Sequence, residues 1–119
     1  MVDALLTFLS QAEGGRSHLN IQLRGLKYRP HIVVGDPSQR HAIIVEGNRL
    51  VESYCGVAFS GGPTKMEANQ QYPVTMMLMY WPHPIYDVVV PGARFTLREG
   101  PMVAAFGEIT RRWTQPQLP

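Results

Sequence analysis

The stretch ARFTLREGPMVAAFGEI, residues 93–109, decides the fold of this chain. Apolar and polar residues alternate over 93–98, and apolar or small residues recur at every second position over 103–109. Alternation with a period of two is the pattern of a strand with one buried face. The Glu99-Gly100 pair between the two runs is typical of a turn. The sequence therefore predicts an antiparallel β-hairpin here.

Other alternating or apolar runs predict further strands over residues 31–34, 41–46, 50–59 and 73–81. A Gly47-Asn48 pair follows the second of these runs and favours a tight hairpin turn, because Gly and Asn readily adopt positive φ. The segment 3–13 fits two structures. It is either a leucine-rich helix that begins at Asp3 or a strand that turns at Gly14-Gly15, and periodicity does not separate the two in so short a run.

Length and composition point to one ordinary globular domain. The chain has 119 residues, of which 45% are hydrophobic and 17% charged. The sequence has no continuous apolar run near the roughly 20 residues of a membrane span. Asp3, rather than a basic segment, precedes the apolar run 4–9, so we do not expect a signal peptide. The lone cysteine, Cys55, favours a buried structural thiol and a cytoplasmic location.

The sequence contains no motif that predicts catalysis or a cofactor. The glycines and the lysine of residues 61–65 lack the spacing of a phosphate-binding loop. Ser60 lacks the first glycine and the following helix of a nucleophile elbow. The histidines and the cysteine lack the spacing of metal ligands. His83, between two prolines and with Asp87 four residues on, is either a catalytic group or part of a rigid turn. We predict no enzymatic activity, no metal and no cofactor.

One predicted loop is basic. Between Glu13 and Asp36 the sequence has no acidic residue, whereas Arg16, Lys27 and Arg29 lie in this interval. Cations held together in a loop suit the phosphate groups of nucleic acid. A solvated polar surface is the alternative interpretation, and the net charge of +2 does not by itself indicate nucleic acid.

Three motifs occur here in the order found in the third, C-terminal domain of elongation factor Tu. They are Leu9-Ser10 with Glu13-Gly14-Gly15-Arg16, then Tyr28-Arg29-Pro30, then His83-Pro84-Ile85 with Arg94-Phe95 and Arg98-Glu99-Gly100. The chain resembles that domain over roughly residues 5–110. We expect an extra hairpin around 40–60, where the chain departs from the family, and a loose tail over 111–119, which has two prolines and little periodicity. The resemblance implies an all-β fold, a six-stranded antiparallel Greek-key barrel over residues 1–110. It also implies that the segment 3–13 is a strand and that His83 has a structural role.

The resemblance also bears on function. In that family the domain holds the T-arm of aminoacyl-tRNA, partly through a Gly-Gly-Arg segment that Arg16 matches. After the Arg-Glu-Gly turn the family has a Gly-Arg-Thr step, where this chain has Pro101-Met102-Val103. A cation and a hydroxyl are thus replaced by apolar side chains, and proline removes a backbone donor, so part of the RNA-facing surface is lost.

Two functions follow as expectations. The first is a stand-alone binding module that uses Pro101, Met102 and Val103 to bind a protein partner, or that competes with elongation factor Tu for one, since methionine is enriched in protein interfaces. The alternative is an accessory factor of translation that binds tRNA or another RNA through Arg16, Lys27 and Arg29.

Overall fold

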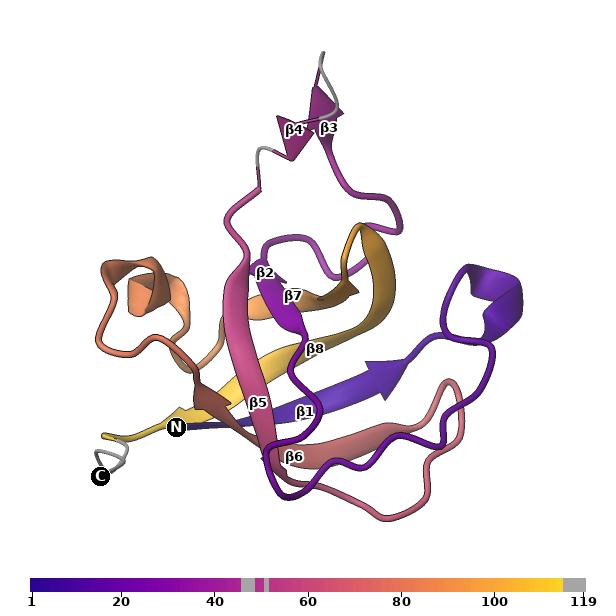
Figure 1. Ribbon diagram of the computed structural model, residues 1–119, viewed down its shortest axis with the longest axis horizontal. Coiled ribbons are helices and arrows are strands. Elements are labelled where there is room, and N and C mark those ends of the chain that lie inside the picture. Colours follow the sequence, from indigo (N-terminus) through magenta and orange to yellow (C-terminus); the bar gives the residue numbers. More distant parts are fainter. Residues whose placement is uncertain (46–48, 51, 115–119) are drawn as a thin grey trace.

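In the computed structural model, which describes residues 1–45, 49–50 and 52–114, six strands close into an antiparallel β-barrel (Figure 1). These strands are β1 (Val2–Phe8), β2 (His31–Val34), β5 (Cys55–Gly61), β6 (Gln71–Leu78), β7 (Arg94–Glu99) and β8 (Met102–Arg112). Their order around the barrel is β1-β6-β5-β2-β7-β8. Because β2, β5 and β6 are successive neighbours and β1 lies beside β6, the arrangement is a Greek key. The predicted fold class is confirmed.

The N-terminal segment is a strand, as the resemblance implied. Buried and half-buried residues alternate along β1, and a short 3-10 helix, η1 (Gln11–Glu13), follows it. Gly14 then adopts a φ of 92°, which glycine tolerates without the steric cost that a side chain would bring. The predicted hairpin is also present, as β7 and β8, and Gly100 in its turn has a φ of 58°.

The C-terminal boundary differs from the prediction. Strand β8 continues to Arg112, so Arg111 and Arg112 belong to the barrel and not to a loose tail. Trp113 extends the pairing, because its N–H donates to the carbonyl of Met1 at 3.1 Å. Strand β8 extends this far because it pairs with β1 along the whole length of β1, from Val2 to Phe8. Residues 115–119 lie outside the described part of the chain.

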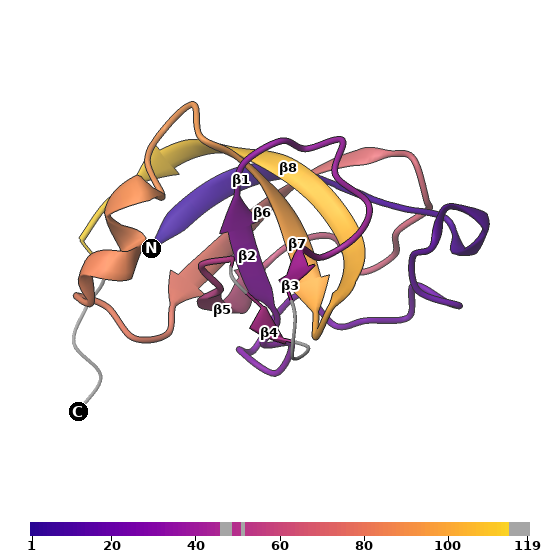
Figure 2. The same ribbon diagram turned by 90° about the horizontal axis from the view of Figure 1, so that it is seen from above.

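Apolar side chains from all six strands fill the core. The largest fully buried ones include Leu6, Phe8, Ile32, Phe59, Met76, Leu78, Phe95 and Leu97. A second 3-10 helix, η2 (Pro84–Val88), adds the buried ring of Tyr86, whose hydroxyl donates to the carbonyl of Gly56 at 2.7 Å. Figures 1 and 2 show η1 and η2 on opposite sides of the barrel. Cys55 is buried, as predicted, and burial raises the pKa of its thiol.

Between β2 and β5 the chain leaves the barrel and forms a separate two-stranded sheet. Its strands are β3 (Ile44–Val45) and β4 (Arg49–Leu50), which pair antiparallel and project away from the barrel (Figure 1). We call the described residues 36–45, 49–50 and 52–54 the arm. The extra hairpin expected around 40–60 is therefore present.

The strands of the arm are shorter than the runs 41–46 and 50–59 predicted. The second run is interrupted over Glu52-Ser53-Tyr54, and strand pairing resumes only at Cys55. The interruption includes Glu52, whose carboxylate is bound to the barrel as described below, so this part of the chain serves attachment rather than pairing. The turn predicted at Gly47-Asn48 lies outside the described residues.

Candidate functional site

The base of the arm is attached to β7 by a buried ion pair. Two guanidinium nitrogens of Arg98, Nη1 and Nη2, donate to the two carboxylate oxygens of Glu52 at 2.9 and 2.8 Å. The side chains are 0% and 7% exposed, respectively. The amide of Gln39 and the backbone N–H of Ile43 donate to the same carboxylate at 2.9 and 2.8 Å. Hydrogen bonds from Arg98 are the main reason why the pKa of Glu52 falls to about 2.

Arg98 has further partners on its other sides. Its Nε donates to the hydroxyl of Thr96 at 2.8 Å, and Nη1 also donates to the hydroxyl of Tyr54 at 3.0 Å. The guanidinium lies over the Tyr54 ring, 5.5 Å from its centroid. A buried charge is tolerated when it is paired and hydrogen-bonded in this way. Sequence reasoning placed Arg98 only on the polar side of a strand, because no local pattern shows that the arm covers this face.

A pocket of about 310 Å³ lies where the arm meets the turn between β7 and β8. Its lining residues are Glu13, Gly14, Arg40, His41, Ala42, Pro101, Met102 and Val103. We call it the turn pocket. His41 and Met102 form an isolated antiparallel bridge that holds the arm beside β8. The fold thus brings the predicted partner-binding segment together with two segments that are distant from it in the sequence.

The three predicted partner-binding residues differ in exposure. Pro101 is exposed and Met102 is half-buried, whereas Val103 is 2% exposed. Val103 lines the turn pocket, and its role in partner binding stays a prediction. A register shift between Leu97 and Arg98 places Val103 opposite Arg98. Cross-strand partners share a face of the sheet, and here it is the outer face that the base of the arm covers.

Arg16 is engaged within the protein rather than free in the basic loop. Its guanidinium donates to the carboxylate of Glu99 at 2.6 Å and lies 5.9 Å from the ring centroid of Tyr28. The Tyr28 hydroxyl donates to the same carboxylate, and burial followed by this carboxylate raises the pKa of Tyr28. Arg16 thus ties the loop to the β7–β8 turn. Lys27 and Arg29 are exposed, as the RNA hypothesis requires.

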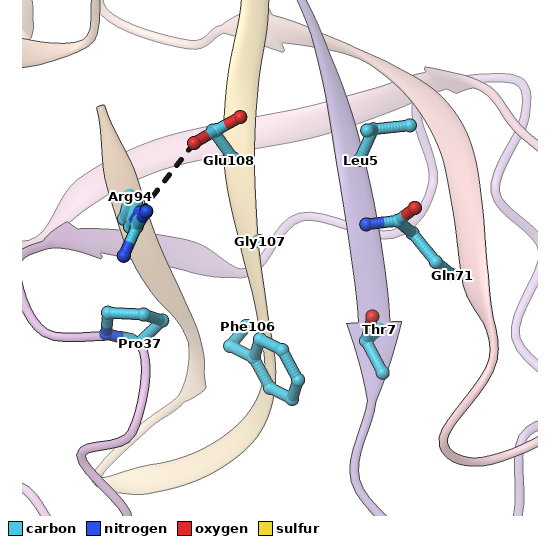
Figure 3. A pocket seen from close by; sticks show the side chains of 8 residues that line it. All are labelled: Leu5, Thr7, Pro37, Gln71, Arg94, Phe106, Gly107 and Glu108. Atoms are coloured by element: carbon cyan, nitrogen blue, oxygen red, sulfur yellow. Dashed lines mark ion pairs between the residues drawn. The ribbon is translucent and has the colours of Figure 1, made fainter. Parts of the chain in front are cut away.

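A second pocket, of about 210 Å³, lies on the outer face of the barrel (Figure 3). Its lining residues are Leu5, Thr7, Pro37, Gln71, Arg94, Phe106, Gly107 and Glu108. The ion pair between Arg94 and Glu108, at 3.6 Å, lies on one side of it, and the Phe106 ring lies on another. The guanidinium of Arg40 lies 5.2 Å from the centroid of that ring. Arg40 also lines the turn pocket and so connects the two pockets.

Other expectations concern residues without a place in these pockets. Nδ1 of His83 accepts a hydrogen bond from the N–H of Ile85 at 3.0 Å and so caps η2, which is a structural role. Within the described residues, no group of three or more His, Cys, Asp and Glu side chains is arranged to hold a metal ion. In the same part of the chain, no helix is long and apolar enough to cross a membrane.

Comparison of the chain with protein-family models found no match, and comparison with curated proteins found none either. The class of the protein therefore rests on its own structure. It is an all-β protein of the closed, six-stranded antiparallel barrel class, with a hairpin arm between β2 and β5.

Proposed function

We propose that this chain is a non-catalytic protein-binding module of the cytoplasm and that the turn pocket is where its partner binds. The observation that carries the proposal is that Pro101 and Met102 line a cavity together with Arg40 and Ala42. An apolar centre with a guanidinium at its rim is the usual composition of a protein interface. A volume of about 310 Å³ is at the small end of ligand pockets, which suits an anchoring side chain of a partner.

The resemblance to the third domain of elongation factor Tu extends this proposal. A barrel that resembles one domain of a translation factor would compete with that factor for a protein that binds the domain. The segment Pro101-Met102 lies at the step where the family carries an RNA-facing cation, and its apolar character favours a protein over RNA at this place.

Met102→Asp tests the turn pocket. We expect it to weaken partner binding by about 2 kcal/mol, roughly 30-fold, because a charge would be desolvated at a central contact. The partner would be isolated with the wild-type chain from native cells, and its affinity measured by calorimetry. Thr110→Asp is the matched control, since Thr110 is exposed on the same strand and outside the pocket.

Equal binding by the two variants would remove the turn pocket from the interface. Loss of the β spectrum and of cooperative unfolding in Met102→Asp alone would show that Met102 belongs to the fold, and the proposal for this turn would then be wrong.

A second candidate function is RNA binding by the basic loop, which the exposure of Lys27 and Arg29 favours. We infer that Arg16 would contribute less than these two, because Glu99 already neutralises it. Replacing Arg16 would also remove the ion-pair partner of Glu99. A variant that includes Arg16 could therefore lose stability as well as RNA contacts, and the two effects would not be separated.

The double variant Lys27→Ala/Arg29→Ala tests this candidate. If both side chains contact phosphates, the slope of log affinity for tRNA against log salt should fall by about 1 to 2. Arg94→Ala/Arg111→Ala removes the same charge from exposed positions on β7 and β8 and should leave the slope unchanged. No tRNA binding by the wild-type chain at low salt would reject the RNA function itself.

A further inference from the structure

The barrel closes without the arm. Each of its strands pairs with two neighbours in the ring, whereas β3 and β4 pair with each other in a separate sheet. The last β2–β5 pair before the arm is Ile32 with Cys55, and it lies within the ring. A two-stranded hairpin alone is only marginally stable in water, so the arm depends on its attachment to the barrel.

The hydrogen bonds that attach the arm to the barrel converge on one carboxylate, that of Glu52. Gln39 and Ile43 lie on the leg of the arm that leaves the barrel, Glu52 lies on the leg that returns, and Arg98 lies on β7. All three others donate hydrogen bonds to Glu52. The carboxylate therefore joins both legs of the arm to each other and to the barrel, and charge-assisted hydrogen bonds of this kind are the strong ones.

Apolar packing under the arm is incomplete. A cavity of about 360 Å³ lies between its base, the end of β2 and η2, and its lining includes Val33, Val34, Ile43 and Val88. Ile43 and Val88 remain 53% and 52% exposed. Other attachments among the described residues are the bridge between His41 and Met102, the contact of Arg40 with Phe106, and the contacts of Tyr54 with Arg98 and the His31 ring. Among these contacts, only the Glu52–Arg98 pair is a buried ion pair between the arm and the barrel.

We propose that the arm opens and closes as one unit on an otherwise intact barrel, and that the Glu52–Arg98 ion pair holds it closed. Local opening of a segment that few apolar contacts hold is a general property of proteins. Opening would carry Arg40, His41 and Ala42 away from the turn pocket, since these residues belong to the arm. The ion pair would then control access to a binding wall that it does not itself touch.

Hydrogen exchange in the wild-type chain, followed by mass spectrometry in increasing urea below the unfolding transition, tests whether the arm opens alone. The exchange rate of peptides that cover residues 37–45 should rise less steeply with urea concentration than the exchange rate of peptides from β1 and β8. If these peptides follow the same urea dependence as the barrel strands, the arm opens only on global unfolding and the proposal is wrong. No partner is needed, so the result is independent of the proposed function.

The variant Glu52→Gln tests the role of the ion pair. Loss of the carboxylate charge should increase opening, and so exchange in residues 37–45, by about 10- to 100-fold while exchange in β1 and β8 stays unchanged. Glu108→Gln makes the same chemical change in the exposed pair with Arg94 and should have no effect on the arm. An equal effect of both variants on residues 37–45, or no effect of Glu52→Gln, would overturn the assignment of Glu52.

Discussion

Replacement of Gly107 by alanine is expected to destabilise the barrel by about 3 kcal/mol or more. A Cβ atom at this position would lie 2.3 Å from the backbone carbonyl oxygen of Leu5 and 2.8 Å from Cζ of Phe95. The Leu5 carbonyl belongs to β1, the strand that closes the ring against β8, so it cannot move without opening the seam. The gain of up to about 1 kcal/mol from a less flexible unfolded chain is smaller than this cost.

Urea unfolding followed by circular dichroism measures the effect, and Gly35→Ala is the matched control. A Cβ at Gly35 would meet no atom within 4 Å, so this change should alter the free energy of unfolding by less than about 1 kcal/mol. If both variants unfold at the same urea concentration, the close approach of β1 and β8 at Gly107 is not a requirement of the fold.

The attachment of the arm is expected to weaken by about 3 kcal/mol as the pH falls from 4.5 to 2. The pKa of Glu52 is about 2 with the arm attached and near its ordinary value of 4.5 in the released chain, mainly because Arg98 donates to the carboxylate. A depressed pKa in the attached state means that the stabilisation is complete above pH 4.5. It is lost as the pH falls toward 2, when Glu52 takes up a proton in both states.

Glu52→Gln separates this effect from other acid titrations. In the described part of the chain, Arg98 contacts the carboxylate and Tyr54 contacts Arg98, with the His31 ring 5.8 Å from that of Tyr54. We expect the protection of residues 37–45 from exchange to fall across this pH interval in the wild type. The variant should show little of that fall. The same fall in both proteins would mean that another group controls the arm at acid pH.

The parts of the fold that the sequence predicted are those that local patterns encode. Strand β2 forms over His31–Val34, and the β7–β8 hairpin turns at Gly100, because alternation and turn residues act within a few positions. The bulge next to Arg98 has no such local signal, and it moves Val103 to the other face. The Glu52–Arg98 pair joins residues 46 positions apart, a contact that no periodicity reveals.

The candidate site was predicted in part for the same reason. The apolar pair Pro101-Met102 is visible in the sequence. The other residues that line the turn pocket come from η1, from Gly14 after η1 and from the arm, and only the closed barrel brings these segments together. The outer-face pocket depends in the same way on side chains of β1, β6, β7 and β8. Arg16 matched a motif, yet its pairing with Glu99 changes its role from an exposed cation to a link between a loop and a hairpin.

The order of strands in the ring also constrains how the chain acquires its structure. Strand β1 pairs with β6 and β8, so among the six barrel strands it is synthesised first and has no partner until β6 has been made. Pairing of such distant segments slows folding, because a long loop must close before the contact forms. Until β8 is added, β1 and β7 each have an unpaired edge, and unpaired strand edges promote association between chains. The seam between β1 and β8 is therefore the last part of the barrel to be completed and the point at which a nascent or truncated chain is most prone to aggregate.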